Sequence, residues 1–546
     1  MELNLPAIHT AIAAAVPDRE CLVHGSRRMS WRDVDERSRR FAGALAARGI
    51  GRRPGDLADS APWESLHDHV ALYLHNGVEY LEAMLGVMKA RAAAVNVNYR
   101  YVAEELGSLL RGARAQVIVY HEAFTPVLVE ILGELPDVEL LVRVPDGSGN
   151  DPLAGSVDYE DFLAGAEDLP AAVSDMWSGD DLYLLYTGGT TGSPKGVCWR
   201  QADFLVAALG VTAPDGSDHE SLEPIVERAR GGSLRALPAP PFMHGAAHWN
   251  AISAWIAGGT VVIQDRTDRL DAADVLDTCE RERVGSLLIV GDAFARPLVD
   301  ELRRRPRDLS ALRFVMTGGA ALGPGLADAF VDLIPTATIL DVLGSSESGR
   351  HGTRRGAGAG AGRFVRSPTT VVLDDAKTRA LAPGSDEVGW LAQAGRVPRG
   401  YLDAPDATAQ TFPVVAGTRY SVPGDRARLL DDGTIELHGR ESVTINSGGE
   451  KIFAEEIEAA LKRHPHVVDA IVVGRPSPRW GQEVVAVVAL RPEVDVSDEE
   501  LLATCAPHLS RFKLPKAIVR RDHIERSPAG KPDYRWAIAQ IAPTDA

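Results

Sequence analysis

Residues 186–196 read YTGGTTGSPKG and continue the apolar run DLYLLYT at 181–187. Hydroxyl side chains at Thr187, Thr190, Thr191 and Ser193 alternate with glycines and precede Lys195. Glycines let the backbone approach an anion and expose its N–H groups, the hydroxyls add donors, and the lysine adds charge. An apolar strand that leads into such a loop is typical of α/β folds. The stretch therefore predicts a phosphate-binding loop in an α/β protein.

Two commoner phosphate loops do not fit the spacing. A P-loop requires GxxxxGK[ST], whereas Lys195 follows Pro194 and precedes Gly196. The motif set of protein kinases is missing from the sequence. The stretch RRGAGAGAGR at 354–363 is not a dinucleotide fingerprint, because the third glycine of GxGxxG would fall on Ala361. We interpret it as a flexible loop, either over a ligand site or simply on the surface.

The composition is that of an acidic globular protein. Of the 546 residues, 45% are hydrophobic and 25% are charged, and the net charge is −18. No nucleic-acid partner is expected, because nucleic-acid binding would require a basic face. An acidic protein that binds anions must gather its cations locally, which makes single lysines and arginines in glycine-rich loops informative.

The cysteines and the N-terminal segment predict a cytoplasmic protein. Four scattered cysteines (Cys21, Cys198, Cys279 and Cys505) form no CxxC pair, which argues against structural zinc or a disulfide framework. The start, MELNLPAIHTAIAAAV, lacks a basic region, so we expect no signal peptide. No apolar run reaches the length of a membrane span.

Short apolar strands alternate with amphipathic helices along most of the chain. The segments 69–74, 116–120, 181–187, 260–264, 285–290 and 312–318 are predicted strands, and 78–90 is a predicted helix. The polar, acidic segment 56–68 is predicted to be a surface insertion. Near residue 440 the pattern changes to a compact α+β unit, with a helix at 454–464 and strands at 467–474 and 484–490. We place a domain boundary at 439–443, which divides the chain into 1–439 and 440–546.

Five further stretches follow the loop in a definite order. They are TGGAAL (317–322), LGSSE (343–347), YSVPGD (420–425), GR at 439–440 with SGGEKI (447–452), and PAGKPDYR (528–535). Together with TGGTTGSPKG, this series resembles the motifs of the adenylate-forming superfamily, which contains acyl-CoA synthetases, luciferases and the adenylation domains of peptide synthetases. The resemblance covers nearly the whole chain.

The resemblance implies a large N-terminal multi-sheet α/β domain that binds AMP and the acyl group, followed by a small mobile α+β domain. It implies a reaction in which a carboxylate attacks the α-phosphate of ATP and the acyl-adenylate is then passed to CoA. Lys531 would bring positive charge to the point where the two anions meet. Glu347 would hold Mg²⁺. His244 would border the acyl site.

The other residues carried over by the resemblance fall into two sets. The expected ATP-binding set is Thr187, Gly188, Gly189, Thr190, Thr191, Gly192, Lys195, Gly319, Ala320, Ala321, Asp341, Ser346, Asp425 and Arg440. Within it, Asp425 would accept hydrogen bonds from both ribose hydroxyls. The expected CoA-binding set is Gly448, Gly449 and Lys451.

The chain departs from the superfamily pattern at three places. Leu343 replaces an aromatic residue that usually stacks on adenine, and Pro423 replaces a threonine. Ser442 and Val443 stand where many members carry an acidic or lysine hinge residue, which leaves the pivot of the small domain undefined. The motifs together look most similar to actinobacterial fatty-acid and sterol side-chain CoA ligases, which implies a hydrophobic carboxylic acid as substrate.

Two other hypotheses remain open from the sequence. The acyl-adenylate could be transferred to the thiol of a carrier protein instead of CoA. The chain could also be a non-catalytic acyl or nucleotide sensor, although Lys195, Glu347, Asp425 and Lys531 together favour an enzyme. The expected partners are ATP, CoA and a carboxylic acid, and a homodimer is left open.

Overall fold

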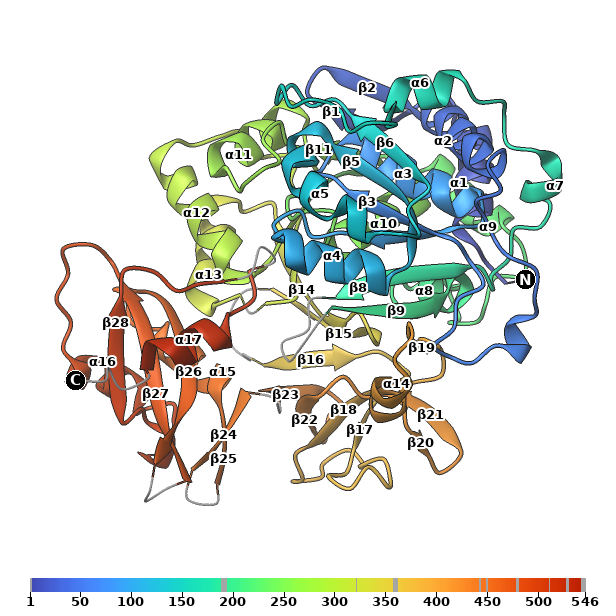
Figure 1. Cartoon of the computed structure of the whole chain (residues 1–546). Coiled ribbons are helices and arrows are strands. Elements are labelled where there is room, and N and C mark those ends of the chain that lie inside the picture. Colours follow the sequence, from blue (N-terminus) through green and yellow to red (C-terminus); the bar gives the residue numbers. More distant parts are fainter. Residues whose placement is uncertain are drawn as a thin grey trace.

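The computed structural model describes residues 2–187, 194–320, 322–356, 362–440, 443–447, 450–477, 481–509, 511–526 and 530–541, with the main chain alone at 440, 444, 446, 450, 451, 481 and 512. The chain forms a large N-terminal body and a smaller C-terminal unit, orange to red in Figure 1, which lies beside α12 and α13. Mixed α/β content with a smaller α+β unit confirms the predicted fold class. No described helix combines the length and the apolar character needed to cross a bilayer.

A parallel sheet of five strands forms one layer of the large body. Its strand order is β4-β3-β5-β6-β7, and every pairing is parallel. The strands are β3 (His69–Tyr73), β4 (Ala93–Asn96), β5 (Ala115–His121), β6 (Leu140–Val144) and β7 (Val157–Asp158). The helices of this half are α1 (Leu5–Ala15), α2 (Trp31–Ala46), α3 (Val78–Lys89), α4 (Ala103–Gly112), α5 (Thr125–Ile131), α6 (Tyr159–Ala164) and α7 (Ala171–Ser174). The predicted strand at 69–74 and helix at 78–90 are thus confirmed as β3 and α3.

The largest sheet begins with parallel strands and continues into an antiparallel half. Its order is β2-β1-β11-β10-β12-β13-β14-β15-β16-β23-β22-β18-β21-β20, with β17 on β18. The parallel region uses β1 (Glu20–His24), β10 (Arg235–Pro238), β11 (Thr260–Ile263), β12 (Ser286–Ile289), β13 (Phe314–Gly318) and β14 (Thr338–Ser345), with β2 (Arg27–Ser30) at its edge. The antiparallel half uses β15 (Gly349–Arg355), β16 (Arg363–Arg366), β17 (Thr370–Leu373), β18 (Gly389–Ala394), β20 (Val414–Val415), β21 (Thr418–Ser421), β22 (Asp425–Leu429) and β23 (Ile435–Arg440).

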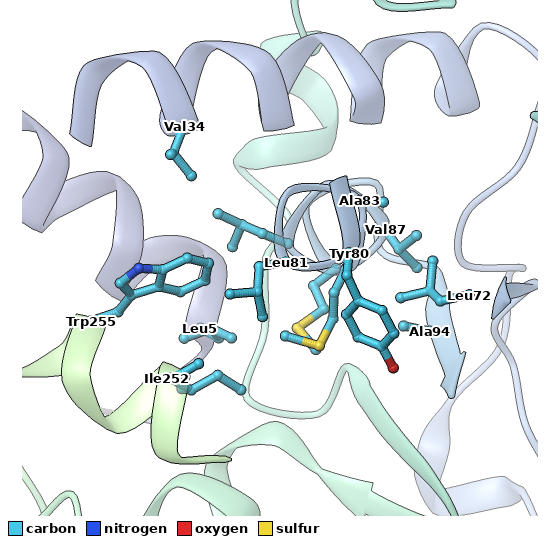
Figure 2. Packing of buried hydrophobic residues seen from close by; sticks show 14 of the residues in the cluster. Leu5, Val34, Leu72, Tyr80, Leu81, Ala83, Val87, Ala94, Ile252 and Trp255 are labelled. Carbon is cyan, nitrogen blue, oxygen red and sulfur yellow. The ribbon is translucent and has the colours of Figure 1, made fainter. Parts of the chain in front are cut away.

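Helices cover the parallel strands on both faces, which is why these strands consist almost wholly of apolar residues. One face packs in a single core cluster with α11 (Ala272–Arg281), α12 (Gly291–Arg304) and α13 (Pro324–Leu333). The other carries α10 (Gly245–Ile256), flanked by α8 (Gln201–Ala207) and α9 (Glu223–Arg230). Figure 2 shows Leu81 of α3 facing Trp255 and Ile252 of α10, while Tyr80 faces Leu72 and Ala94 of the parallel sheet. The two sheets are therefore joined through one continuous core.

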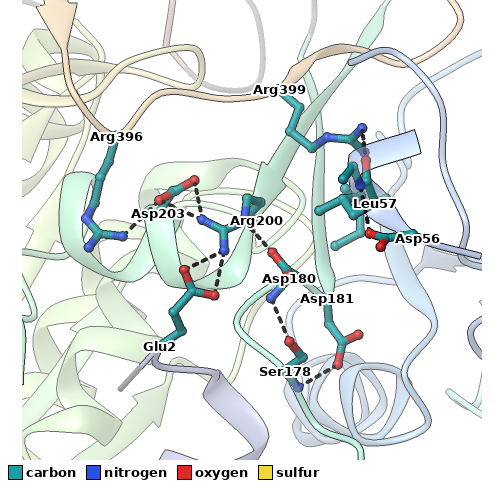
Figure 3. A network of polar contacts seen from close by, with 12 residues as sticks. Glu2, Asp56, Leu57, Ser178, Asp180, Asp181, Arg200, Asp203, Arg396 and Arg399 are labelled. Atoms are coloured by element: carbon teal, nitrogen blue, oxygen red, sulfur yellow. Dashed lines mark hydrogen bonds and ion pairs between the residues drawn. The ribbon is translucent and has the colours of Figure 1, made fainter. Parts of the chain in front are cut away.

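The phosphate-loop hairpin is fixed at its base by an ion-pair network. Strands β8 (Leu182–Thr187) and β9 (Lys195–Arg200) pair antiparallel, with β19 (Gly400–Tyr401) added to β9. Arg200, at the end of β9, donates to Asp180 at 2.5 Å and to both carboxylate oxygens of Glu2 at 2.6 Å (Figure 3). The network ties the hairpin to the N-terminal segment and to the strand before it.

The acidic segment 56–68 is attached to the same region. The guanidinium of Arg399 donates to the carbonyls of Ser60 and Ala61, each at 3.0 Å. His67 at the end of the segment is buried and lies 3.4 Å from the carboxylate of Asp181. The expectation of a surface insertion holds for the exposed first part only, because the last residues reach the core beneath the hairpin.

The C-terminal unit is a second sheet with its own hydrophobic core. Its strands are β24 (Thr444–Ser447), β25 (Glu450–Phe453), β26 (Val467–Ser477), β27 (Gly481–Leu490) and β28 (Ala517–Arg521), and its helices are α15 (Ala454–Leu461), α16 (Asp498–Cys505) and α17 (Tyr534–Ile541). The predicted boundary at 439–443 falls between β23, which belongs to the large sheet, and β24. Gly439 has φ +113, and a Cβ placed there would lie 2.2 Å from Oε2 of Glu455 in α15. The positive φ favours glycine at this junction, and any larger residue would also displace the Glu455 side chain.

Buried histidines predict that the fold loses stability in acid. Burial lowers the pKa of His351 from 6.5 to about 4, so its neutral form is favoured in the folded state. The unfolded chain takes up a proton there between pH 6.5 and 4, and the folded chain does not. Stability therefore falls as the pH falls through this window, by about 1.4 kcal/mol per pH unit for one such group.

We expect His351→Leu to make the free energy of unfolding less dependent on pH between 6.5 and 4 by about that slope, measured by urea titration at several pH values. The exposed His508 supplies the control, since His508→Leu should leave the dependence unchanged. Identical slopes for the wild type and His351→Leu would contradict the assignment of a buried neutral imidazole.

Candidate active site

The phosphate-binding loop is closed by pairing of its two ends. Thr187 is the register partner of Lys195 across the β8–β9 hairpin. The predicted residues between them, Gly188, Gly189, Thr190, Thr191 and Gly192, lie outside the described residues. The Lys195 side chain is exposed, and its Nζ stands 5.4 Å from the centroid of the Tyr401 ring. This is the geometry of a cation over an aromatic face.

The same tyrosine contacts the predicted metal-binding carboxylate. Tyr401 Oη donates to Oε1 of Glu347 at 3.0 Å. Glu347 is half-buried in the turn between β14 and β15. Tyr401 therefore bridges Lys195 of the phosphate loop and Glu347 of the LGSSE motif. These two residues lie 152 positions apart in the sequence.

Two further contacts hold the turn that carries Glu347. Trp199 Nε1 donates to the carbonyl of Ser346 at 2.9 Å, and Ser421 Oγ donates to the carbonyl of Glu347 at 2.6 Å. Ser421 belongs to the YSVPGD motif, so this bond joins the two predicted ATP-binding motifs directly. Four residues later, Asp425 begins β22 as the register partner of Arg440, of which only the main chain is described.

The TGGAAL segment places its backbone at the carboxyl end of β13. Gly319 has φ +79, and a Cβ there would meet nothing within 4 Å, so its backbone is open to a ligand. Ala320 is half-buried against the helical layer, and Ala321 lies outside the described residues. Asp341, the weakest member of the predicted ATP set, is buried and paired with Arg354 at 2.7 Å. The side chain of Leu343 packs in the core of the antiparallel half.

His244 sits at the N-cap of α10 with a neutral ring. Burial lowers its pKa to about 3, helped by the positive charge of Lys531. Within the described part of the chain its Nε2 is buried and makes no hydrogen bond. Beside it, His248 Nδ1 donates to the carbonyl of Phe242 at 2.7 Å, and Nε2 of the same neutral ring accepts from the hydroxyl of Tyr183, which fixes the start of α10. A neutral imidazole with an unused nitrogen can bind a polar group of a ligand.

The packing of Gly530 shows that the loop carrying the C-terminal lysine reaches the large body. Gly530, with φ +72, packs on Val290 at the end of β12, where a Cβ would lie 3.3 Å from the Val290 carbonyl oxygen. Lys531 itself is exposed. The loop is braced within its own unit by Arg526, which donates to the Gly530 carbonyl at 3.0 Å and pairs with Asp469.

An ion pair between described residues supports this docked position. Nζ of Lys462, just after α15, lies 3.3 Å from Oδ2 of Asp292 at the start of α12, with exposed side-chain fractions of 12% and 8%. The other carboxylate oxygen of Asp292 accepts from the N–H of Gly323 at 2.6 Å. One carboxylate thus connects the C-terminal unit to the helical layer of the large body.

The predicted CoA-binding residues are only partly covered by the structure. Gly448 and Gly449 lie outside the described residues. The main chain of Lys451 belongs to β25, where it is the register partner of Asn446. Their roles stay predictions.

Sequence reasoning missed Tyr401, Trp199, Ser421 and Asp292. Tyr401 and Trp199 come from strands that meet only through the β9–β19 pairing. Ser421 lies in the YSVPGD motif, in which the sequence analysis assigned a role only to Asp425. No motif or spacing in the sequence indicates that Asp292 contacts Lys462, which lies 170 residues later.

Comparison with known proteins agrees with this geometry. The family described as "AMP-binding enzyme" matches residues 10–402, and the "AMP-binding enzyme C-terminal domain" matches residues 456–531. The chain belongs to the AMP-binding enzyme family. This confirms the resemblance to the adenylate-forming superfamily.

Curated relatives cover the whole chain. It is 49% identical over 542 residues to a medium-chain acyl-CoA ligase, Mig, of Mycobacterium avium, which covers 98% of both chains. It is 38% identical over 561 residues to a 3-oxocholest-4-en-26-oate–CoA ligase of Rhodococcus rhodochrous, covering 100% of this chain and 97% of the relative. The solved structure of the anthranilate CoA ligase AuaEII with anthranoyl-AMP has a TM-score of 0.82 at 22% identity, covering 99% and 98% of the two chains, and supports the fold.

Removal of the Tyr401 hydroxyl tests its bridging position. Tyr401→Phe keeps the ring under Lys195 but deletes the hydrogen bond to Glu347. A hydrogen bond to a charged group contributes about 1.5–3 kcal/mol, so we expect ATP–pyrophosphate exchange to slow by roughly 10- to 100-fold. Tyr101→Phe, which removes a phenol beside α4, is the control and should keep the wild-type rate. An unchanged rate in Tyr401→Phe would show that Glu347 needs no positioning by this residue.

Proposed function

We propose that the protein is an ATP- and Mg²⁺-dependent carboxylate–CoA ligase that works through an acyl-adenylate. The observation that carries this proposal is that the loop of Lys531, from a separate C-terminal unit, packs through Gly530 on Val290 at the end of β12 in the large body. Family membership and relatives that are CoA ligases along their full length support the same reaction.

In the first half-reaction, a carboxylate oxygen attacks the α-phosphorus of ATP and pyrophosphate leaves. Both partners are anions, so the attack requires positive charge at the place where they meet. Lys531 supplies it from the C-terminal unit, and Lys195 supplies charge to the phosphates from the loop. The Gly319 backbone borders the base, and Asp425 accepts from the ribose hydroxyls.

The residues present fit a magnesium ion that is held mainly by substrate. In the described residues no group of three or more His, Cys, Asp or Glu side chains could form a protein-only metal site. Mg²⁺ commonly uses one or two carboxylates together with nucleotide phosphates. Glu347 supplies such a hard oxygen ligand, and Tyr401 engages one of its two oxygens. The ion would neutralise charge on the phosphate oxygens.

In the second half-reaction, the CoA thiol attacks the carbonyl carbon of the acyl-adenylate and AMP leaves. Lys531 is no longer needed, so the C-terminal unit can turn away and bring Gly448, Gly449 and Lys451 toward the thiol path. The contacts that hold the docked state, chiefly Lys462–Asp292 and Gly530 on Val290, are few enough to be broken and remade in each cycle.

The acid is proposed to be largely hydrophobic. The relatives named above act on a medium-chain acyl group and on a sterol side-chain acid, respectively. The face of α10 beyond His244 carries Trp249 and lies against Met316 of β13, which offers apolar contact to an acyl group. We place the reaction in the cytoplasm, where the four buried, free thiols would stay reduced.

A single experiment separates this proposal from its alternatives. Purified protein with ATP, Mg²⁺ and a panel of carboxylic acids should catalyse acid-dependent ATP–pyrophosphate exchange, and CoA should then stimulate release of AMP and thioester. Exchange without CoA stimulation would favour a carrier-protein acceptor. Absence of exchange with every acid would favour a sensor and refute the ligase.

We predict that Lys531→Ala separates the two half-reactions. Adenylation should fall by at least about 100-fold, because the charge at the point of attack is lost. Thioester formation from supplied acyl-adenylate and CoA should persist near the wild-type rate. The two steps are measured separately by pyrophosphate exchange and by thioester release, and an equal loss in both would refute the domain-rotation account.

We predict that Glu347→Gln raises the concentration of Mg²⁺ needed for half-maximal adenylation and lowers its maximal rate by about tenfold or more. The amide keeps the side-chain shape and can still accept from Tyr401, so a loss reports on the carboxylate charge. Magnesium titrations of pyrophosphate exchange provide the measurement. An unchanged magnesium dependence would remove Glu347 from the metal site.

A further inference from the structure

Arg350 is a half-buried arginine that has no acidic partner in the part of the chain that the structure describes. It follows Glu347 by three residues, near the start of β15. Most arginines of this acidic chain form ion pairs, for example Arg354 with Asp341 on the same strand. Among the described residues, no ion pair or side-chain hydrogen bond involves the Arg350 guanidinium, and burial alone lowers its pKa. A half-buried guanidinium without a partner keeps its five N–H donors available to a ligand.

The strand register places Arg350 on the sheet face that carries α10. Met316 of β13 is the register partner of Leu340 in β14, and Gly344, four residues along the same strand, is the partner of Arg350. Residues i, i+2 and i+4 of a strand point to one face, so Met316, Leu340 and Arg350 share it. The opposite face is the one packed against the helical layer of α11, α12 and α13.

Contacts from the helices agree with this placement. A Cβ added at Gly210, just after α8, would lie 2.6 Å from Nη2 of Arg350, so the guanidinium lies directly against that turn. Phe204 of α8 in turn packs edge-on against Trp249 of α10, with ring centroids 5.5 Å apart. The guanidinium is therefore on the same side of the sheet as α10, the helix that begins at His244.

A second polar group on this side is also incompletely bonded. Asn250, next to Trp249 on α10, donates from Nδ2 to the sulfur of Met316 at 3.4 Å, and a thioether is a weak acceptor. Its Oδ1 is buried and makes no hydrogen bond to any described residue. An apolar face with one charged donor and one underused amide suits a ligand that is mostly hydrocarbon but carries oxygen.

We propose that the acid activated by this enzyme carries a second oxygen function, a keto, hydroxyl or carboxylate group, that Arg350 binds. Arg350 is then a specificity-determining residue of the acyl site, with Asn250 as its polar neighbour. The inference rests on the proposed ligase function. The apolar remainder of the acid packs between α10 and the sheet, against Trp249, Met316 and Leu340.

The position of Arg350 limits where that oxygen stands. A strand advances about 3.3 Å per residue, so the backbone of Arg350 is at most roughly 10 Å from that of Glu347. The second oxygen is accordingly expected near the turn that carries Glu347, and the chain-length series below measures its separation from the activated carboxyl group. A guanidinium binds a carboxylate through two parallel hydrogen bonds, which favours an anionic oxygen over a neutral one.

The test compares matched acids in the pyrophosphate-exchange assay. Each straight-chain acid of six to twelve carbons is paired with its keto and ω-carboxylate derivatives, and the ratio of kcat/KM between derivative and parent is measured for each chain length. The wild type is expected to favour a derivative at one chain length. Arg350→Met, which keeps an unbranched stem but removes the guanidinium, should lower that ratio by about 10- to 100-fold, mainly through KM, as expected for loss of a hydrogen bond to a charged group.

Arg355→Met is the matched control, because Arg355 is an exposed arginine on the same strand. Arg355→Met should leave the kcat/KM ratio at the wild-type value. Arg350→Lys should retain part of the preference for the derivative that Arg350→Met loses. The inference would be overturned if Arg350→Met left the ratio unchanged, or if the wild type favoured the unsubstituted parent acid at every chain length. In either case, pyrophosphate exchange on the parent acids would still support the ligase. A wild type without exchange on any acid would instead refute the proposed function.

Discussion

The position of the C-terminal lysine depends on a small contact between the two parts of the chain. The carboxylate of Asp292 binds Lys462 of the C-terminal unit through one oxygen and the N–H of Gly323 through the other. Next to it, Gly530 packs on the backbone of Val290, so Lys531 is delivered close to α10. A partly buried ion pair in a low-dielectric setting is stronger than an exposed one, yet one pair is weak enough to be broken in each turnover. A docked state that is stable but reversible is what a two-step reaction with one mobile cation requires.

The site residues of the large body, Glu347 and Lys195, are in contrast held by several contacts within that body. Glu347 is positioned by Tyr401 through its side chain and by Ser421 through its carbonyl, and Trp199 holds the preceding residue. The hairpin that carries Lys195 is fixed at its base by the network around Arg200 (Figure 3). Preorganised polar groups lose little energy to reorganisation when charge moves during the reaction. The proposed division between a fixed site and a moving lysine agrees with the contacts that the described residues make in each part.

The distribution of charge explains why single cations are informative in this protein. With a net charge of −18, most arginines are matched by carboxylates and serve the structure. Lys195 over the Tyr401 ring and Arg350, which has no acidic partner among the described residues, are two cations outside these pairs. The first faces the predicted phosphate loop and the second faces the side where an acyl group would lie. Lys195 and Arg350 therefore lie where the proposed substrates would bring phosphate or another oxygen group.

The sequence alone determined the fold class, the order of the motifs and the family, and these are confirmed by the comparisons and by elements such as β3, α3 and β8. Such features depend on local patterns: alternation of apolar residues, glycine spacing and the short motifs themselves. The assignment of individual site residues stays a prediction, and several of them, including the glycines of the phosphate loop, lie outside the described residues. Tertiary structure decided which distant residues meet: Tyr401 with Glu347, Asp292 with Lys462, and Arg350 with the turn at Gly210. Strand register and domain docking bring these groups together across 54 to 170 positions, as residues 347 and 401 or 292 and 462 illustrate. Contacts over such separations depend on the packing of the whole chain, and no local spacing encodes them.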